Sequence, residues 1–181
     1  MSKERLQRVD PVRVSHACVD MLSKTARDLS EAEVRDIALR CLGRREYGVE
    51  ELRRKILQRG ADQHIVDTVV DDLAEDRLVS DQRFTEMYIR TRARSLFGPV
   101  KIRGELRSRG VSDSVIEEFM PDEQDVWFDA AAHWAAKRCH GDSGCIDLDY
   151  AERAKLHRSL TNRGFTHEQV NVALDRLKSN D

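Results

Sequence analysis

The sequence is poor in the residues that make tight turns, aromatic cores and membrane spans. Its 181 residues include nine glycines, three prolines and only 6% aromatic residues. Glycine and proline average about 12% of a protein, so their scarcity disfavours a fold of many short strands. No apolar stretch approaches the roughly 20 residues that cross a membrane, and the first residues lack the apolar run of a signal peptide. We therefore predict a cytoplasmic protein with no membrane partner.

Catalytic and metal-binding patterns are also missing. The chain has no GxxxxGK[ST] loop, no HExxH and no GxSxG, and its six histidines are scattered. The His and Cys residues within 133–145 lack the spacing of a zinc site. We predict a binding protein rather than an enzyme, with no metal and no cofactor. No cysteine pair has CxxC spacing, and a reducing compartment predicts free thiols. The cysteines are Cys18, Cys41, Cys139 and Cys145.

The most informative feature is an internal repeat with a period of 50 residues. Val34 aligns with Phe84, and the match continues without a gap until Val70 meets Met120. The matched positions keep their hydrophobic character, and several glycines and arginines coincide as well. This agreement over successive segments indicates an internal duplication.

A third copy follows at a further offset of 54, where Leu156, Leu160 and Gly164 succeed Ile102, Leu106 and Gly110. We predict an all-α protein of three tandem three-helix repeats in an elongated, curved array, and we expect a monomer. The predicted loop at 140–149 is interpreted as a connector in preference to a binding loop. The predicted units are an N-terminal arm at 1–29 and repeats at 30–79, 80–121 and 122–181.

Each copy carries the same signals for the ends of its helices. Ser30 followed by Glu33 forms a capping box at the start of the first helix. A glycine follows the second helix of each copy, where a left-handed conformation costs glycine least, and a helix N-cap residue comes two positions later. These glycine and N-cap pairs are Gly60 with Asp62, Gly110 with Ser112, and Gly164 with Thr166.

Charge is unevenly distributed along the chain, although the formal net charge is only −2. The predicted second helices are basic, whereas 62–76 and 112–120 hold six and three acidic residues with no Lys or Arg. These acidic third helices disfavour a helix-turn-helix reader of DNA, whose second element needs basic and polar side chains. Segment 88–110 has seven basic residues and one acidic residue, which suits a partner made of protein and nucleic acid. Ion pairs within the molecule are the alternative explanation.

The segment 71–111 resembles the signature of the RecX family, regulators of the bacterial recombinase RecA. The family is built from tandem three-helix repeats, in agreement with the duplication, and the resemblance covers about residues 31–178. The matching positions are Leu78, Asp81, Arg83, Phe84, Tyr88, Arg90, Arg92, Arg94, Gly98, Ile102, Glu105, Leu106 and Gly110.

The resemblance implies a modulator, usually inhibitory, that binds the RecA filament on DNA. It would limit ATP hydrolysis, strand exchange and the co-protease activity of the SOS response, with weak and nonspecific binding to single- or double-stranded DNA. We expect filament and DNA contacts at Arg90, Arg94, Lys101, Arg103, Arg107 and Arg109, with Arg40, Arg44, Arg53 and Arg54 as the equivalent stripe in the first repeat.

Two other classes of function remain open from the sequence. One is a helix-turn-helix-like DNA-binding regulator, or a single-stranded DNA binder, that acts without RecA. The other is a structural adaptor for a different protein. A separate alternative concerns the predicted arginines, which can neutralise the neighbouring acidic helices instead of contacting a partner.

Overall fold

The computed structural model describes residues 29–121, 124–139 and 149–177, and within these ranges every regular element is a helix. The prediction of an all-α protein of three tandem three-helix repeats is confirmed. The predicted arm up to residue 28, and residues 140–148 of the predicted loop, lie outside the described ranges. The first repeat comprises α2 (Glu31–Leu42), α3 (Val49–Leu57) and α4 (Gln63–Glu75), the second α5 (Asp81–Arg94), α6 (Pro99–Ser108) and α7 (Asp113–Phe119), and the third α8 (Gln124–Cys139), α9 (Tyr150–Asn162) and α10 (His167–Arg176).

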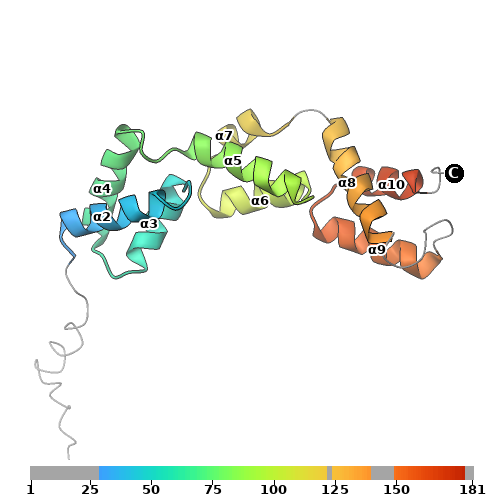
Figure 1. Cartoon of the computed structure of the whole chain (residues 1–181), viewed down its shortest axis with the longest axis horizontal. Coiled ribbons are helices and arrows are strands. Elements are labelled where there is room, and N and C mark those ends of the chain that lie inside the picture. Colours follow the sequence, from blue (N-terminus) through green and yellow to red (C-terminus); the bar gives the residue numbers. More distant parts are fainter. Residues whose placement is uncertain (1–28, 122–123, 140–148, 178–181) are drawn as a thin grey trace, which may run out of the picture.

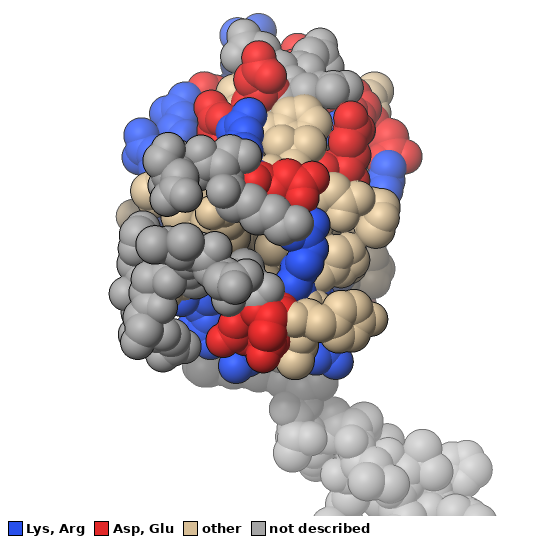
Figure 2. Space-filling view, turned by 90° about the vertical axis from the view of Figure 1, so that its right-hand side faces the viewer, with Lys and Arg blue, Asp and Glu red and all other residues tan. Residues whose placement is uncertain are grey.

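The three repeats lie one after another along the long axis of the molecule (Figure 1). Viewed from the end formed by the third repeat, the outline is compact, and basic and acidic side chains alternate over the surface (Figure 2). Small units have much surface for their volume, which explains how a chain with 35% charged residues folds. No helix in the described ranges combines the length and apolar character needed to cross a membrane.

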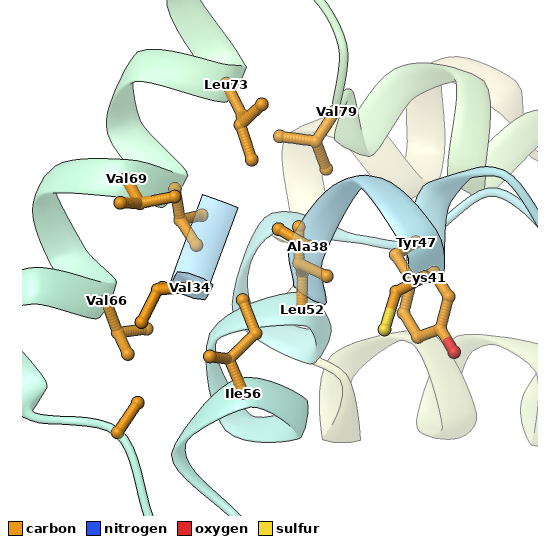
Figure 3. Packing of buried hydrophobic residues seen from close by; sticks show 12 residues of the cluster. Val34, Ala38, Cys41, Tyr47, Leu52, Ile56, Val66, Val69, Leu73 and Val79 are labelled. Carbon is orange, nitrogen blue, oxygen red and sulfur yellow. The ribbon is translucent and has the colours of Figure 1, made fainter. Parts of the chain in front are cut away.

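Each repeat has its own hydrophobic core, and helices pack mainly against the other two helices of their repeat. In the first repeat, Val34 from α2, Ile56 from α3 and Val66 from α4 point into one centre (Figure 3). The repeat register predicted from the sequence places equivalent residues in the three cores. Buried in all three copies are Leu52, Ile102 and Leu156; Ile56, Leu106 and Leu160; Ala61, Val111 and Phe165; Val66, Ile116 and Val170; and Val70, Met120 and Leu174.

The predicted helix signals adopt the expected geometry. The Ser30 and Glu33 capping box is formed, and the three predicted N-caps of the third helices each accept hydrogen bonds from the first turn. Gly60, Gly110 and Gly164 have φ of 83°, 91° and 86°. This left-handed conformation ends the second helix of every repeat. The amide of each glycine bonds back to a carbonyl of the last turn, and at Gly110 and Gly164 the next amide does so as well.

The cysteines depart in part from the prediction of free thiols. Cys41 is free and lies in the core of the first repeat, as expected for a small apolar residue. Cys139, at the end of α8, is disulfide-bonded, so the prediction is wrong for this residue. The prediction relied on the absence of CxxC spacing, but a disulfide requires only that two Cα atoms come within about 7 Å. Spacing along the chain does not report that distance.

The second and third repeats meet through backbone contacts at the start of α6. The amides of Gly98 and Val100 donate to the carbonyls of Arg163 and Gly164, at 2.8 and 3.0 Å. These amides belong to the first turn of α6, which has no hydrogen-bond partners inside its own helix. The end of α9 therefore caps the start of α6. A Cβ at Gly164 would lie 2.3 Å from Lys101 Cβ, and one at Gly98 would lie 2.3 Å from the Gly164 carbonyl carbon.

The first and second repeats meet through the equivalent elements. Asp81 Oδ1 accepts from the Val49 amide at 2.8 Å and so caps α3 from the second repeat. The glycine turn after α6 rests on the first turn of α3, because a Cβ at Gly110 would lie 2.5 Å from Glu50 Cβ. The Arg54 guanidinium adds a bond of 2.7 Å to the Ser108 carbonyl. At both junctions, a glycine turn of one repeat contacts the start of the second helix of the preceding repeat.

Ion pairs join the basic second helix to the acidic third helix in the first two repeats. Arg53 on α3 contacts Asp67 and Asp71 on α4, at 2.7 and 2.5 Å. Arg103 on α6 makes a bidentate pair with Glu117 on α7, at 2.7 and 2.9 Å. The repeat period relates Arg53 to Arg103 and Asp67 to Glu117, so this ion pair is a repeated feature of the fold. The hydrogen bond from Arg103 is the main cause of a lowered pKa for Glu117.

We predict that Gly164→Ala destabilises the protein more than Gly60→Ala. Both glycines have positive φ, so alanine costs about 1–2 kcal/mol in backbone strain at either position. A Cβ at Gly60 meets nothing within 4 Å, whereas one at Gly164 clashes with Lys101. Forcing an atom into a packed contact costs about 1–3 kcal/mol more. Urea unfolding of both variants measures the difference, and equal losses would contradict the packing role of Gly164.

We also predict that the contribution of the Arg103 ion pair depends on pH. A carboxylate whose pKa is lowered in the folded state adds stability above its unfolded pKa and loses it as the pH falls through the folded pKa. Arg103→Gln should therefore cost up to about 1 kcal/mol at pH 7, and this cost should fade below about pH 4. Arg90→Gln is the control, since Arg90 pairs only with exposed Glu86 on its own helix. Denaturation at pH 7 and pH 3 tests this, and a cost that persists at pH 3 would contradict it.

Candidate functional site

The ten basic residues predicted to contact a filament differ in what they touch. Arg53 and Arg103 hold the ion pairs between second and third helices. Arg107 pairs with Asp113 at 2.6 Å, on the exposed surface. A guanidinium that bridges two helices has fewer donors left for a partner. These three residues therefore contribute to the internal neutralisation that the sequence left open as an alternative.

Arg54 and Arg109 lie at the junction of the first and second repeats. Arg109 approaches Glu51 at 3.4 Å and stacks on the Tyr88 ring, 4.7 Å from its centroid. Together with Tyr47, Arg54 and Arg109 line a pocket of about 390 Å³. Glu51 also lines this pocket, so a carboxylate partly neutralises the positive charge of the pocket. Its other lining residues are Arg45, Lys55, Gln58 and Ser108.

The remaining five residues are more open to a partner. Arg40 and Arg90 are exposed and pair only with a carboxylate one turn earlier on their own helix. Exposed pairs of this kind are worth only about 0.3–0.5 kcal/mol, so they exchange readily. Arg44 and Arg94 are exposed, and neither forms an ion pair within the described part of the chain. Lys101 is half-buried, with its Nζ 5.0 Å from the centroid of the Phe97 ring.

Arg94 opens into a second pocket, of about 400 Å³, at the junction of the second and third repeats. Ser95 and Leu96 line it from the end of α5, and Arg163 lines it from the end of α9. Its described lining residues include four basic side chains and no Asp or Glu. Its other members, Trp134, Lys137 and Arg138, come from α8.

Arg163 is the most constrained of these cations. Its Nη1 donates to the carbonyls of Ser95 and Leu96, each at 3.0 Å. The guanidinium also lies 4.6 Å from the centroid of the Phe97 ring and 5.1 Å from that of Trp134. Burial without a carboxylate partner lowers the pKa of this arginine. The pocket therefore contains a positive charge that is held in place and partly desolvated.

Sequence reasoning missed three of the basic residues in this pocket: Lys137, Arg138 and Arg163. The repeat register aligns Arg163 with Arg109, which was predicted, and the two arginines both lie at a repeat junction. Register was therefore a usable signal for Arg163. Lys137 and Arg138 are a basic pair in the last turn of α8, and only their place in the same pocket as the end of α5 distinguishes them from other surface charges.

The other candidate functional residues are the two tryptophans and the potential metal ligands. Trp127 is buried in the core of the second repeat, whereas Trp134 is half-buried at the edge of the basic pocket. Across the described ranges, no three His, Cys, Asp or Glu residues are grouped as metal ligands. His157 Nε2 and His167 Nδ1 lie 3.3 Å apart.

Three sequence models of the RecX family match the chain in order. The first three-helix domain matches residues 35–73, the second matches 80–120, and the third matches 124–174. Together they account for most of the chain and coincide with the three groups of helices described above.

Relatives and solved structures agree with these matches. A regulatory protein RecX from Halorhodospira halophila is 40% identical over 152 residues, 84% of this chain and 92% of the relative. One from Chromohalobacter salexigens is 40% identical over 144 residues, 80% of this chain and 92% of the relative. The crystal structure of RecX from Lactobacillus salivarius has the same fold, with a TM-score of 0.68 at 20% identity over 82% of this chain and 97% of that one. Three tandem domain matches and close relatives along most of its length show that the chain belongs to the RecX family of regulatory proteins.

Proposed function

We propose that this protein is a cytoplasmic, monomeric modulator of RecA with no catalytic activity of its own. It binds the RecA filament on DNA and limits ATP hydrolysis, strand exchange and the co-protease activity that induces the SOS response. Membership of the RecX family across all three domains carries this proposal. RecA is the partner that the resemblance of the second repeat implies.

The shape and the charges of the molecule support a filament as the partner. Stacked repeats form extended surfaces that suit long partners, and the three repeats here lie in a row (Figure 1). Arg44 and Arg94 occupy equivalent positions in successive repeats, and both are exposed without an ion-pair partner among the described residues. An arginine fork binds carboxylates and phosphates alike, so such residues suit a partner that presents both groups.

The helix-turn-helix alternative receives less support from the same structure. A reader of the major groove presents basic and polar side chains on its second element. The corresponding third helices here include α4, which has no Lys or Arg, and its Asp67 and Asp71 are engaged by Arg53. We therefore favour regulation of the filament over recognition of a duplex operator.

The direct test is the ATPase activity of RecA on single-stranded DNA, titrated with this protein. We expect the steady-state rate to fall in a saturable manner as the protein is added. A rate that stays unchanged up to a large excess of protein over RecA would contradict the proposal.

We predict that Arg44→Glu combined with Arg94→Glu weakens this inhibition. Losing and reversing two exposed charges should raise the half-inhibiting concentration about tenfold or more, where tenfold corresponds to about 1.4 kcal/mol. Arg103 is left intact because its reversal would place a carboxylate against Glu117. The readout is the half-inhibiting concentration in the ATPase titration.

The matched control is Lys155→Glu combined with Arg158→Glu. These two basic residues on α9 are also exposed and make no ion pair within the described residues, so the change in net charge is the same. Thermal unfolding of all samples verifies that they are folded. If both double variants inhibit as the unaltered protein does, the predicted surface is wrong.

A further inference from the structure

The pocket between the second and third repeats has no assigned role. We propose that it binds a phosphodiester of single-stranded DNA, with Arg94, Lys137 and Arg138 supplying charge and Arg163 supplying an oriented guanidinium. This inference rests on the proposed function and deepens it, because it locates the DNA contact of the regulator at one repeat junction.

The first support for the proposal is the unbalanced charge of the pocket. Most arginines in the described ranges pair with a carboxylate, whereas Arg94, Lys137 and Arg138 pair with none. No Asp or Glu is among the described residues that line the pocket, in contrast to the pocket at the first junction, which includes Glu51. Like charges gathered in a concavity repel one another and raise the local concentration of anions. An anionic ligand relieves this repulsion.

The second support is the preorganisation of Arg163. Two carbonyls and two aromatic rings hold its guanidinium in place before any ligand arrives. Both carbonyl bonds use Nη1, and no hydrogen bond within the described residues uses Nε or Nη2. A planar fork with two unused donor groups fits the oxygens of a phosphate. Because its position is already fixed, binding costs little side-chain entropy.

The third support is the form of the pocket, which favours a single strand over a duplex. A volume of about 400 Å³ is in the range of pockets that enclose a small organic ligand. A flexible strand can bring one phosphate and its sugar into such a concavity, whereas a rigid duplex presents its phosphates on a convex surface. Trp134 forms an aromatic edge of the pocket. Basic grooves with aromatic side chains are typical of single-strand binders.

The test is binding of the full chain to a fluorescent oligothymidylate, measured by anisotropy at several salt concentrations without RecA. Each phosphate contact to a single strand contributes about 0.7 to the slope of log affinity against log salt. We expect Lys137→Gln combined with Arg138→Gln to weaken binding and, by loosening the one phosphate contact in the pocket, to reduce the magnitude of this slope by up to about 0.7. Lys155→Gln combined with Arg158→Gln removes the same charge from the same repeat and should leave the slope unchanged.

Two results with the variants would overturn the proposal. One is an unaltered slope for the pocket variant, and the other is an equal reduction for the pocket and control variants. An unmodified protein that fails to bind the oligonucleotide would overturn it as well. Because RecA is absent, each of these failures is independent of the ATPase titration and leaves the proposed regulation of RecA to be judged on its own test. Circular dichroism of each variant confirms that its helices are intact.

Discussion

The contact between a glycine turn and the start of a helix in the preceding repeat orders the entire array. Each repeat has its own core, so core packing contributes little to the junctions beyond Trp127 of α8, which is buried in the core of the second repeat. The junctions depend instead on the turns at Gly110 and Gly164, which lie so close to the preceding repeat that a Cβ would clash. A positive φ is needed to end the helix there, and absence of a side chain is needed for the close approach. Only glycine satisfies both conditions.

The packing of the repeats also determines which positive charges have no carboxylate partner. Within the first two repeats, the basic second helix and the acidic third helix neutralise each other through Arg53 and Arg103. Where the third repeat meets the second, Arg163 bonds to carbonyls instead of a carboxylate, and other cations gather around it. A cluster of positive charge without carboxylate partners among the described residues therefore lies at this junction.

Much of the fold was predictable because its determinants are local or periodic. Apolar spacing, capping residues and glycines at a period of 50 identify the helices, their ends and the repeats. Five aligned positions are buried in all three copies, since equivalent residues of a duplicated unit face equivalent cores. The candidate site was only partly predictable. Arg44 and Arg94 are exposed as a contact surface requires, but the sequence does not distinguish them from Arg53 and Arg103, which are engaged in ion pairs.

The sequence by itself determined the helical class, the repeat register, the turn geometry and the resemblance to RecX, because each depends on residues that are near in the chain or regularly spaced. Only the tertiary structure decided which charges remain unpaired, that Cys139 is disulfide-bonded, and that Lys137 and Arg138 join Arg94 in one pocket. These features depend on distances between residues far apart in the chain. The sequence specifies the charge of each side chain, but the packing of the helices determines which group that side chain contacts.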